Sequence, residues 1–296
     1  MMIKGFIALL LLTFSSFVFA QGNLLDRKYK LGDSYQYKLT CIEYHNGKWE
    51  STIVSICKLS VGRDSNGVYF DEIHWVSKKV FSQKDTIDQK EKAILVKPYH
   101  ISLQKNGKLD LPKIEIPAMT EPIQDFNTFF VAISPQMGTT ELKSAGDSIS
   151  KKDLVKADFS NGDFILKGDD CFSIKLKMTG VTKITVMTEV DFLPPQVICF
   201  PYLLDDMKTP VIDGIINNFQ MVQPTGNQKF NVQYGREIFY INSINQRSDG
   251  KLLSATMNNT LNLKLKINCD KDYKNSQTEI PFTIQRNLKL ELLKIN

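Results

Sequence analysis

The feature that most constrains this chain is an alternation of apolar and polar residues that recurs on either side of glycine-containing turns. It is clearest between residues 31 and 59, where Asn46-Gly47 separates two such runs. Successive side chains of a β-strand point to opposite faces, so a period of two predicts strands with one buried face and one wet face. Asn-Gly accepts the positive φ angles of a tight turn, so this stretch is expected to form a β-hairpin. The apolar residues of its first strand are Tyr35, Tyr37, Leu39 and Cys41.

The same alternation continues along the chain, with further Asn-Gly or Asp-Gly pairs between the runs. Short strands separated by such turns are typical of an antiparallel meander. The predicted fold class is therefore mainly β: a curved antiparallel meander or half-barrel with one or two short covering helices. The expected strands include residues 68–80, 93–103, 172–178, 184–192, 230–244, 252–257, 261–269 and 282–292.

A Gly-Asp-Ser motif occurs twice at the expected start of a strand, at Gly32-Asp33-Ser34 and at Gly146-Asp147-Ser148. An Asn-Gly pair follows each copy at a similar distance, and a third copy is expected at Tyr234-Gly235-Arg236. Internal duplication would explain this recurrence. The general use of Gly and Asn in turns between strands of similar length would explain it equally well. The spacing is too irregular for a solenoid or a propeller.

Two segments have the period of a helix instead. The first follows Thr120-Glu121-Pro122, where a hydroxyl cap, an acid and a proline are typical of a helix start, and Ser134-Pro135 is expected to end it. The second follows Thr209-Pro210, although Gly214 disfavours a helix there by about 1 kcal/mol. Each apolar stripe is expected to cover the curved sheet and contact a ligand; ordinary core packing is the alternative. The predicted ligand contacts are Ile123, Phe126, Phe129 and Phe130 in the first stripe, and Val211, Ile215 and Phe219 in the second.

Residues 1–20 indicate export. They combine a positively charged start at Lys4, an apolar run over residues 6–19, and Val18-Phe19-Ala20, which resembles a cleavage site. The run is shorter than the roughly 20 residues of a spanning helix, although an uncleaved anchor is the alternative. We expect residues 1–20 to be a signal peptide. Residues 21–296 should then form a β-rich domain with no integral membrane span, with 192–228 as the seam between two sheet halves. A Gram-negative periplasmic or secreted protein is expected.

Composition and charge exclude a nucleic-acid partner. The 296 residues are 42% hydrophobic and 23% charged, which is ordinary for a globular protein. The net charge is +5, but basic residues are dispersed among acidic ones, so no basic groove is expected. No basic run is interleaved with aromatic residues, as a single-strand binder would require.

The cysteines are interpreted mainly as small buried hydrophobic residues. Their number is odd, so they cannot all pair, and none has a Cys-x-x-Cys or zinc-ligand spacing. One disulfide is the alternative, with Cys41–Cys57 as the nearest pair in sequence. The cysteines are Cys41, Cys57, Cys171, Cys199 and Cys269.

No catalytic constellation is recognisable. His45, His74 and His100 lack a metal-ligating spacing, and exposed or structural roles are expected for them. The chain has no nucleophile elbow, phosphate-binding loop or dinucleotide fingerprint. Adjacent acids such as Asp169-Asp170 would point to opposite faces of a strand. We therefore expect no catalytic residue, no metal and no cofactor, and a protein that is not an enzyme.

The segment Lys30-Leu31-Gly32-Asp33-Ser34-Tyr35-Gln36-Tyr37-Lys38 resembles the start of a family of exported Gram-negative β-proteins of unknown function. That family pairs this start with a mid-chain Gly-Asp-Ser-Trp segment. Here Ile149 stands in place of the tryptophan, so the match is partial, and it covers residues 28–190. The family is similar in architecture to lipoprotein carriers of the LolA/LolB kind, whose concave face is covered by helices and holds acyl chains. The resemblance implies that fold and ligand class, and it transfers no ligand residue to this chain.

Two functions are expected as alternatives. The first is a non-enzymatic binding protein for a lipid, another apolar small molecule or a lipidated protein, held beneath the two stripes. Burying an acyl chain would contribute about 0.8 kcal/mol per methylene. The second is an envelope structural module, or a module that contacts a protein or a glycan, with a filled core. The two alternatives differ in whether the concave face is open or filled.

Overall fold

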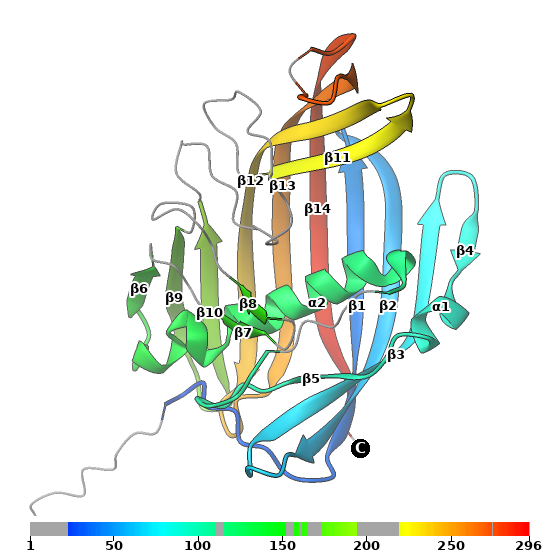
Figure 1. The fold of residues 1–296 in the computed structure, drawn as a ribbon. Helices are drawn as coiled ribbons and strands as arrows, with labels where there is room; N and C mark the ends of the chain where they lie inside the picture. Colours follow the sequence, from blue (N-terminus) through cyan, green and yellow to red (C-terminus); the bar gives the residue numbers. More distant parts are fainter. Residues whose placement is uncertain are drawn as a thin grey trace, which may run out of the picture.

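The computed structural model describes residues 23–109, 115–151, 157–159, 162–164, 173–193, 219–273 and 275–295. Twelve strands form one antiparallel sheet that curves around a helix and does not close (Figure 1). The mainly β fold class is therefore confirmed. These strands are β1 (Ser34–His45), β2 (Lys48–Arg63), β3 (Tyr69–Ser82), β4 (Thr86–Asp88), β5 (Tyr99–Ile101), β6 (Ser148–Lys151), β9 (Ile174–Val181), β10 (Thr185–Phe192), β11 (Phe219–Gly226), β12 (Lys229–Gln246), β13 (Leu252–Cys269) and β14 (Thr278–Ile295).

The sheet joins two ends of the chain that are far apart in sequence. Its strand order is β4-β3-β2-β1-β14-β13-β12-β10-β9-β6, with β5 paired to β3 and β11 paired to β12. The first strand therefore lies beside the last, with Leu39 opposite Leu290. A separate two-stranded sheet pairs β7 (Ala157–Phe159) with β8 (Gly162–Phe164).

The first hairpin forms as the alternation predicts. Tyr35, Tyr37 and Leu39 of β1 are buried, and polar residues lie between them. Asn46 and Gly47 both have positive φ angles, 49° and 76°, as the Asn-Gly turn requires. The side-chain oxygen of Asn46 also accepts a hydrogen bond from the backbone N–H of Thr283, at 2.9 Å. The turn is thereby fixed to β14 as well as to β2.

The two Gly-Asp-Ser motifs are the same structural device. The backbone N–H of Gly32 donates to the carbonyl of Val61, and that of Gly146 donates to the carbonyl of Met178. In each case the partner residue donates its own N–H to the carbonyl of the Asp that follows the glycine. Each motif therefore begins a strand and pairs its first residues with the neighbouring strand through two backbone hydrogen bonds. The expected third copy is wrong, because Gly235 lies inside β12, paired with Leu263.

The first covering helix is confirmed. A 3-10 turn, η1 (Pro117–Met119), leads into α2 (Thr120–Ala132), which crosses the inner face of the sheet (Figure 1). The helix stops before Ser134-Pro135, where η2 (Pro135–Met137) and then η3 (Thr139–Glu141) follow. The predicted hydroxyl cap is wrong, because Met119 holds the N-cap position and makes no side-chain cap bond. Helical geometry already begins in η1, so Thr120 lies inside the helical segment.

The second predicted helix falls mostly outside the described residues, which omit Val211 and Ile215. At Phe219 the prediction is wrong, because this residue starts β11 and pairs with Gly235. The predicted seam around residues 192–228 stays a prediction. Its described flanks belong to one sheet, since Phe192 of β10 pairs with Phe239 of β12.

The strand expected over residues 93–103 is mostly wrong. The segment contains the end of the short helix α1 (Lys90–Ile94) and only the three-residue strand β5. Ile94 and Leu95 expose 57% and 65% of their surface, so these apolar residues do not mark a buried face.

Candidate functional site

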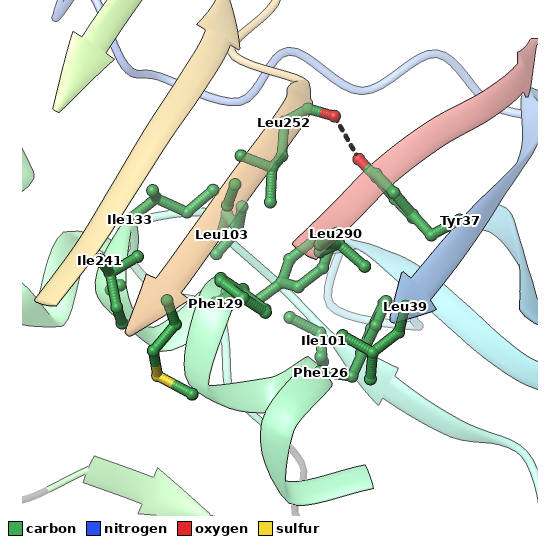
Figure 2. Packing of buried hydrophobic residues seen from close by; sticks show 14 of the residues in the cluster. Tyr37, Leu39, Ile101, Leu103, Phe126, Phe129, Ile133, Ile241, Leu252 and Leu290 are labelled. Atoms are coloured by element: carbon green, nitrogen blue, oxygen red, sulfur yellow. Dashed lines mark hydrogen bonds between the residues drawn. The ribbon is translucent and has the colours of Figure 1, made fainter. Parts of the chain in front are cut away.

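The lower part of the concave face is filled by side chains from α2 and the sheet (Figure 2). The ring of Phe126 lies 6.0 Å from that of Tyr37 and 5.7 Å from that of Trp75, both nearly edge to face. The Tyr37 hydroxyl donates to the carbonyl oxygen of Leu252 at 2.5 Å, so its polar end is satisfied within the core. Side chains from the helix and the sheet therefore form one buried hydrophobic cluster in this part of the interior.

The helix stripe points into this core. Phe126 and Phe129 are 0% exposed, and Ile123 and Phe130 are 1% and 2% exposed. The structure thus brings together the predicted ligand contacts of the first stripe, and it places them against the sheet. A ligand would reach them only if α2 moved, and their role as ligand contacts stays a prediction.

The polar edge of α2 is bound to the sheet by one arginine. Arg286 of β14 donates to Glu121 and to Asp125, each at 2.6 Å. The two acids are one helical turn apart, so both reach the same guanidinium. The thiol of Cys41 lies 3.9 Å from the Glu121 carboxylate. This cluster separates the filled part of the concave face from the part beyond the helix.

Burial dominates the electrostatics of the cluster. It raises the pKa of Asp125 to about 7, although Arg286 acts in the opposite direction. Arg286 is shared with Glu121, and Glu237 of β12 adds a third carboxyl whose pKa is also raised by burial. Burial likewise raises the pKa of Cys41 to about 12, so the thiol is protonated at neutral pH and is a poor nucleophile.

The ligand atoms of Cys41, Glu121 and Asp125 lie within 4.8 Å of one another, which is close enough to share a metal ion. The guanidinium of Arg286, however, already contacts both carboxylates. A divalent cation entering this space would be repelled by the arginine. The arrangement fits an ion-pair cluster that attaches α2 to the sheet better than it fits a metal centre.

We expect Asp125→Asn to flatten the pH dependence of stability. The folded-state pKa of Asp125 is raised above its usual value, so its contribution is fully present below about pH 4 and is lost as the pH rises through about 7. The wild-type free energy of unfolding should therefore fall more between pH 5 and pH 8 than that of the variant. Guanidinium denaturation at several pH values measures this difference.

Glu291→Gln is the matched control, because Glu291 is paired on the surface with Lys38 and Lys289 and its pKa is lowered. This variant should leave the slope above pH 5 unchanged. Equal slopes for Asp125→Asn and the wild type would show that Asp125 does not carry the effect.

A second buried polar cluster ties the N-terminal segment to the sheet. Tyr35 donates its hydroxyl proton to Asp71, and Arg27 donates to the hydroxyl oxygen of Tyr35 at 3.1 Å. The side chains of Arg27 and Asp71 are only 2% and 0% exposed. The backbone N–H of Lys28 also donates to the carbonyl of Asp249, at the turn between β12 and β13. Sequence reasoning missed this cluster, although a buried tyrosine such as Tyr35 requires a partner for its hydroxyl.

Beyond α2, the concave face continues as an apolar strip on β13 and β14. Leu261 lies opposite Ile284, and Leu263 lies opposite Phe282. Both leucines are 4% exposed, yet neither belongs to the two hydrophobic clusters that the described residues form. Further along the strip, Ile280 is 42% exposed. The sequence predicted strands over 261–269 and 282–292, which contain all of these residues except Ile280, but it did not indicate a binding surface there.

Comparisons with known proteins add little. No protein-family model and no curated protein matches the chain. A solved structure described as lipid-protein interactions in lipovitellin aligns with a TM-score of 0.40 and 8% identity, covering 91% of this chain and 26% of that one. This chain thus corresponds to about a quarter of that protein. A mutant of Rh. blastica porin aligns with a TM-score of 0.17 and 9% identity, covering 88% of this chain and 99% of that one.

Among the described residues, no helix combines the length and the apolar character needed to cross a lipid bilayer.

Proposed function

We propose that this chain is an exported, non-enzymatic binding protein that holds an apolar ligand on the concave face of its sheet. The observation that carries the proposal is the apolar strip of Leu261, Leu263, Phe282 and Ile284, which continues the inner face past α2. The ligand class is a lipid or another chain-like apolar molecule, including the acyl group of a lipidated protein. The same class is suggested by the partial resemblance of residues 28–190 to exported β-proteins whose architecture is similar to that of LolA/LolB-like carriers.

Unlike the core below α2, the strip has a charged border at one end and a partly exposed end at the other. On the side of the helix it is bordered by the Arg286 cluster, which holds charges at a fixed place. At the far end Ile280 is partly exposed, so the strip runs from a polar border towards solvent. An acyl chain lying along it would gain about 0.8 kcal/mol for each buried methylene, so ten methylenes would contribute about 8 kcal/mol before the cost of immobilisation is subtracted.

Displacement of a fluorescent fatty acid tests this proposal. The protein should bind 11-(dansylamino)undecanoic acid, and palmitate should displace it. Phe282→Asp places a charge on the strip at a half-buried position, so it should weaken binding at least about tenfold through the cost of desolvating a carboxylate. Leu263→Asp should do the same at the opposing residue. Mass spectrometry of lipids extracted from the native protein would then identify the natural ligand.

Ile244→Asp is the matched control, because Ile244 lies on β12 and is 38% exposed. It should bind the probe as the wild type does. Circular dichroism and thermal unfolding verify that each variant is folded. If the folded wild type does not bind the probe, or if Ile244→Asp and Phe282→Asp weaken binding equally, the proposal is wrong.

The filled interior beneath α2 favours a second function, an envelope structural module or a module that binds a protein or glycan by its edges or loops. Phe126 and Phe129 are fully buried between the helix and the sheet. Such a module would give no signal with the fatty-acid probe. A pull-down from envelope extract would recover a defined partner.

Export and the lack of enzymatic activity are parts of the same proposal. The basic and apolar residues 1–20 support export to the periplasm or the medium. The arrangement around Cys41 supports a non-enzymatic role, because the thiol has a raised pKa and the nearby acids are bound by Arg286. Mass spectrometry of the N-terminal peptide of the purified exported protein should place Gln21, as glutamine or pyroglutamate, at the first position.

A further inference from the structure

Two of the three histidines meet at one carboxylate on the outer face of the sheet. Glu72 and His74 are two residues apart on β3, so their side chains leave the same face. His100 of β5 lies directly opposite Glu72 in the strand pairing. Nε2 of His74 contacts Oε1 of Glu72, and Nε2 of His100 lies 3.2 Å from Oε2. The sequence predicts exposed or structural roles for these histidines, because it shows no metal-ligating spacing between them.

The position of His100 is fixed by packing. Its ring stacks on Phe70 with centroids 4.0 Å apart and an interplanar angle of 24°. Phe70 can lie there because its partner on β2 is Gly62, where a Cβ atom would come within 2.5 Å of the phenylalanine ring. The imidazole is thus held over the carboxylate by an aromatic neighbour.

The three groups are accessible and chemically suited to a metal ion. The side chains of His74, His100 and Glu72 are 42%, 43% and 36% exposed, so an ion can reach them from solvent. Lys58 lies opposite His74 on β2, but it is exposed and its flexible side chain can turn into solvent.

One pair of donor atoms already has the spacing of two ligands on one metal ion, but the three donors do not yet point at one common position. Two donors on one tetrahedral zinc ion are about 3.4 Å apart, given Zn–N and Zn–O bonds of about 2.0–2.2 Å. The 3.2 Å between His100 and Glu72 already matches that spacing. The histidines contact different oxygens of Glu72, so the His74 side chain must change its rotamer before all three donors can bind one ion. Two imidazoles and a carboxylate, with water as the fourth ligand, form a well-known type of zinc site.

We propose that His74, His100 and Glu72 form a surface site for one divalent transition-metal ion such as Zn²⁺. The site lies on the outer face of the sheet, at the pairing of β3 with β5, and is independent of the apolar strip on the concave face. The ion would link the short strand β5 to the long strand β3 and replace the hydrogen bonds that now join them.

Calorimetric titration of the tag-free protein with zinc chloride tests this site. The wild type should bind one ion per chain through these residues. His74→Gln and His100→Gln should each weaken that binding at least about tenfold, the scale on which even supporting groups of a metal site act. Both side chains lie on the surface, so circular dichroism should show that the variants fold as the wild type does.

His45→Gln is the matched control. His45 also contacts a glutamate two residues away, with Nε2 2.6 Å from Oε1 of Glu43, and its ring lies against Phe282. It should bind zinc as the wild type does. In NMR spectra, substoichiometric Co²⁺ should broaden the ring protons of His74 and His100 and leave those of His45 sharp. Absence of binding to the wild type, survival of binding in the His74→Gln/His100→Gln double variant, or an equal loss in His45→Gln would overturn the proposal.

Discussion

Arg27→Met is expected to lower the free energy of unfolding by about 3–5 kcal/mol, because it leaves a buried carboxylate without its counter-charge. Arg27 and Asp71 form an ion pair 3.8 Å long from which water is excluded, with Tyr35 bound to both. Burial already raises the pKa of Asp71, and loss of the arginine would raise it further. The Asp71 carboxylate could then be neutralised only by taking up a proton. The loss should therefore be larger at pH 8 than at pH 5, which guanidinium denaturation at both pH values measures.

Lys38→Met is the control for this effect. Lys38 pairs with Glu291 at 3.1 Å, but both side chains are about a third exposed, so its removal should cost less than about 1 kcal/mol. Adding Asp71→Asn to Arg27→Met removes the uncompensated charge and should recover part of the loss. A loss below about 1 kcal/mol in Arg27→Met would show that the pair does not stabilise the fold, and no recovery in the double variant would show that charge is not the cause.

The sequence predicted the structure best where burial follows the local spacing of apolar residues along the chain. In β1 the buried residues and the Asn46-Gly47 turn are those that the period of two predicts. The same is true of α2, whose apolar stripe is buried in full. In both elements the apolar side chains that share the predicted face are the ones that are buried, so a local pattern suffices for them.

Prediction failed where apolar residues lie on the surface. Ile94 and Leu95 read as part of a strand, but they are exposed on and just after a short helix. Such exposed apolar residues do not mark a buried face, so their place in the sequence pattern predicts no strand. Phe219 is a different failure, because it is half-buried: the sequence predicts the end of a helical stripe there, but this residue starts β11.

The features that define both candidate sites depend on contacts between distant parts of the chain. Arg286 meets Glu121 because β14 lies beside β1 under the helix, and no local pattern indicates that pairing. His74 meets His100 because β5 returns to β3 after a helix and a loop. Buried ion pairs and cross-strand clusters of this kind arise from topology, which the alternation of residues leaves undetermined.

Phe126→Ala is expected to cost about 3–5 kcal/mol of unfolding free energy, the range found when a large aromatic side chain is deleted from a close-packed core. The ring of Phe126 is fully buried and contacts Tyr37 of β1, Trp75 of β3 and, at a centroid distance of 4.8 Å, Phe130 on its own helix. Its deletion removes the contacts that attach the helix to two strands at once. Chemical denaturation measures the loss.

Gln124→Ala is the control on the same helix. Gln124 is exposed, so its replacement by a good helix former should change stability by less than about 0.5 kcal/mol. The comparison also separates two positions for the ligand, on the strip beyond α2 or beneath the helix. If Phe126→Ala lowers the free energy of unfolding by several kcal/mol and still binds the fatty acid, the ligand lies on the strip around Leu263 and Phe282, beyond the helix. A loss below about 1 kcal/mol, accompanied by tighter binding of the probe, would instead mean that α2 is loosely held and that the ligand enters beneath it.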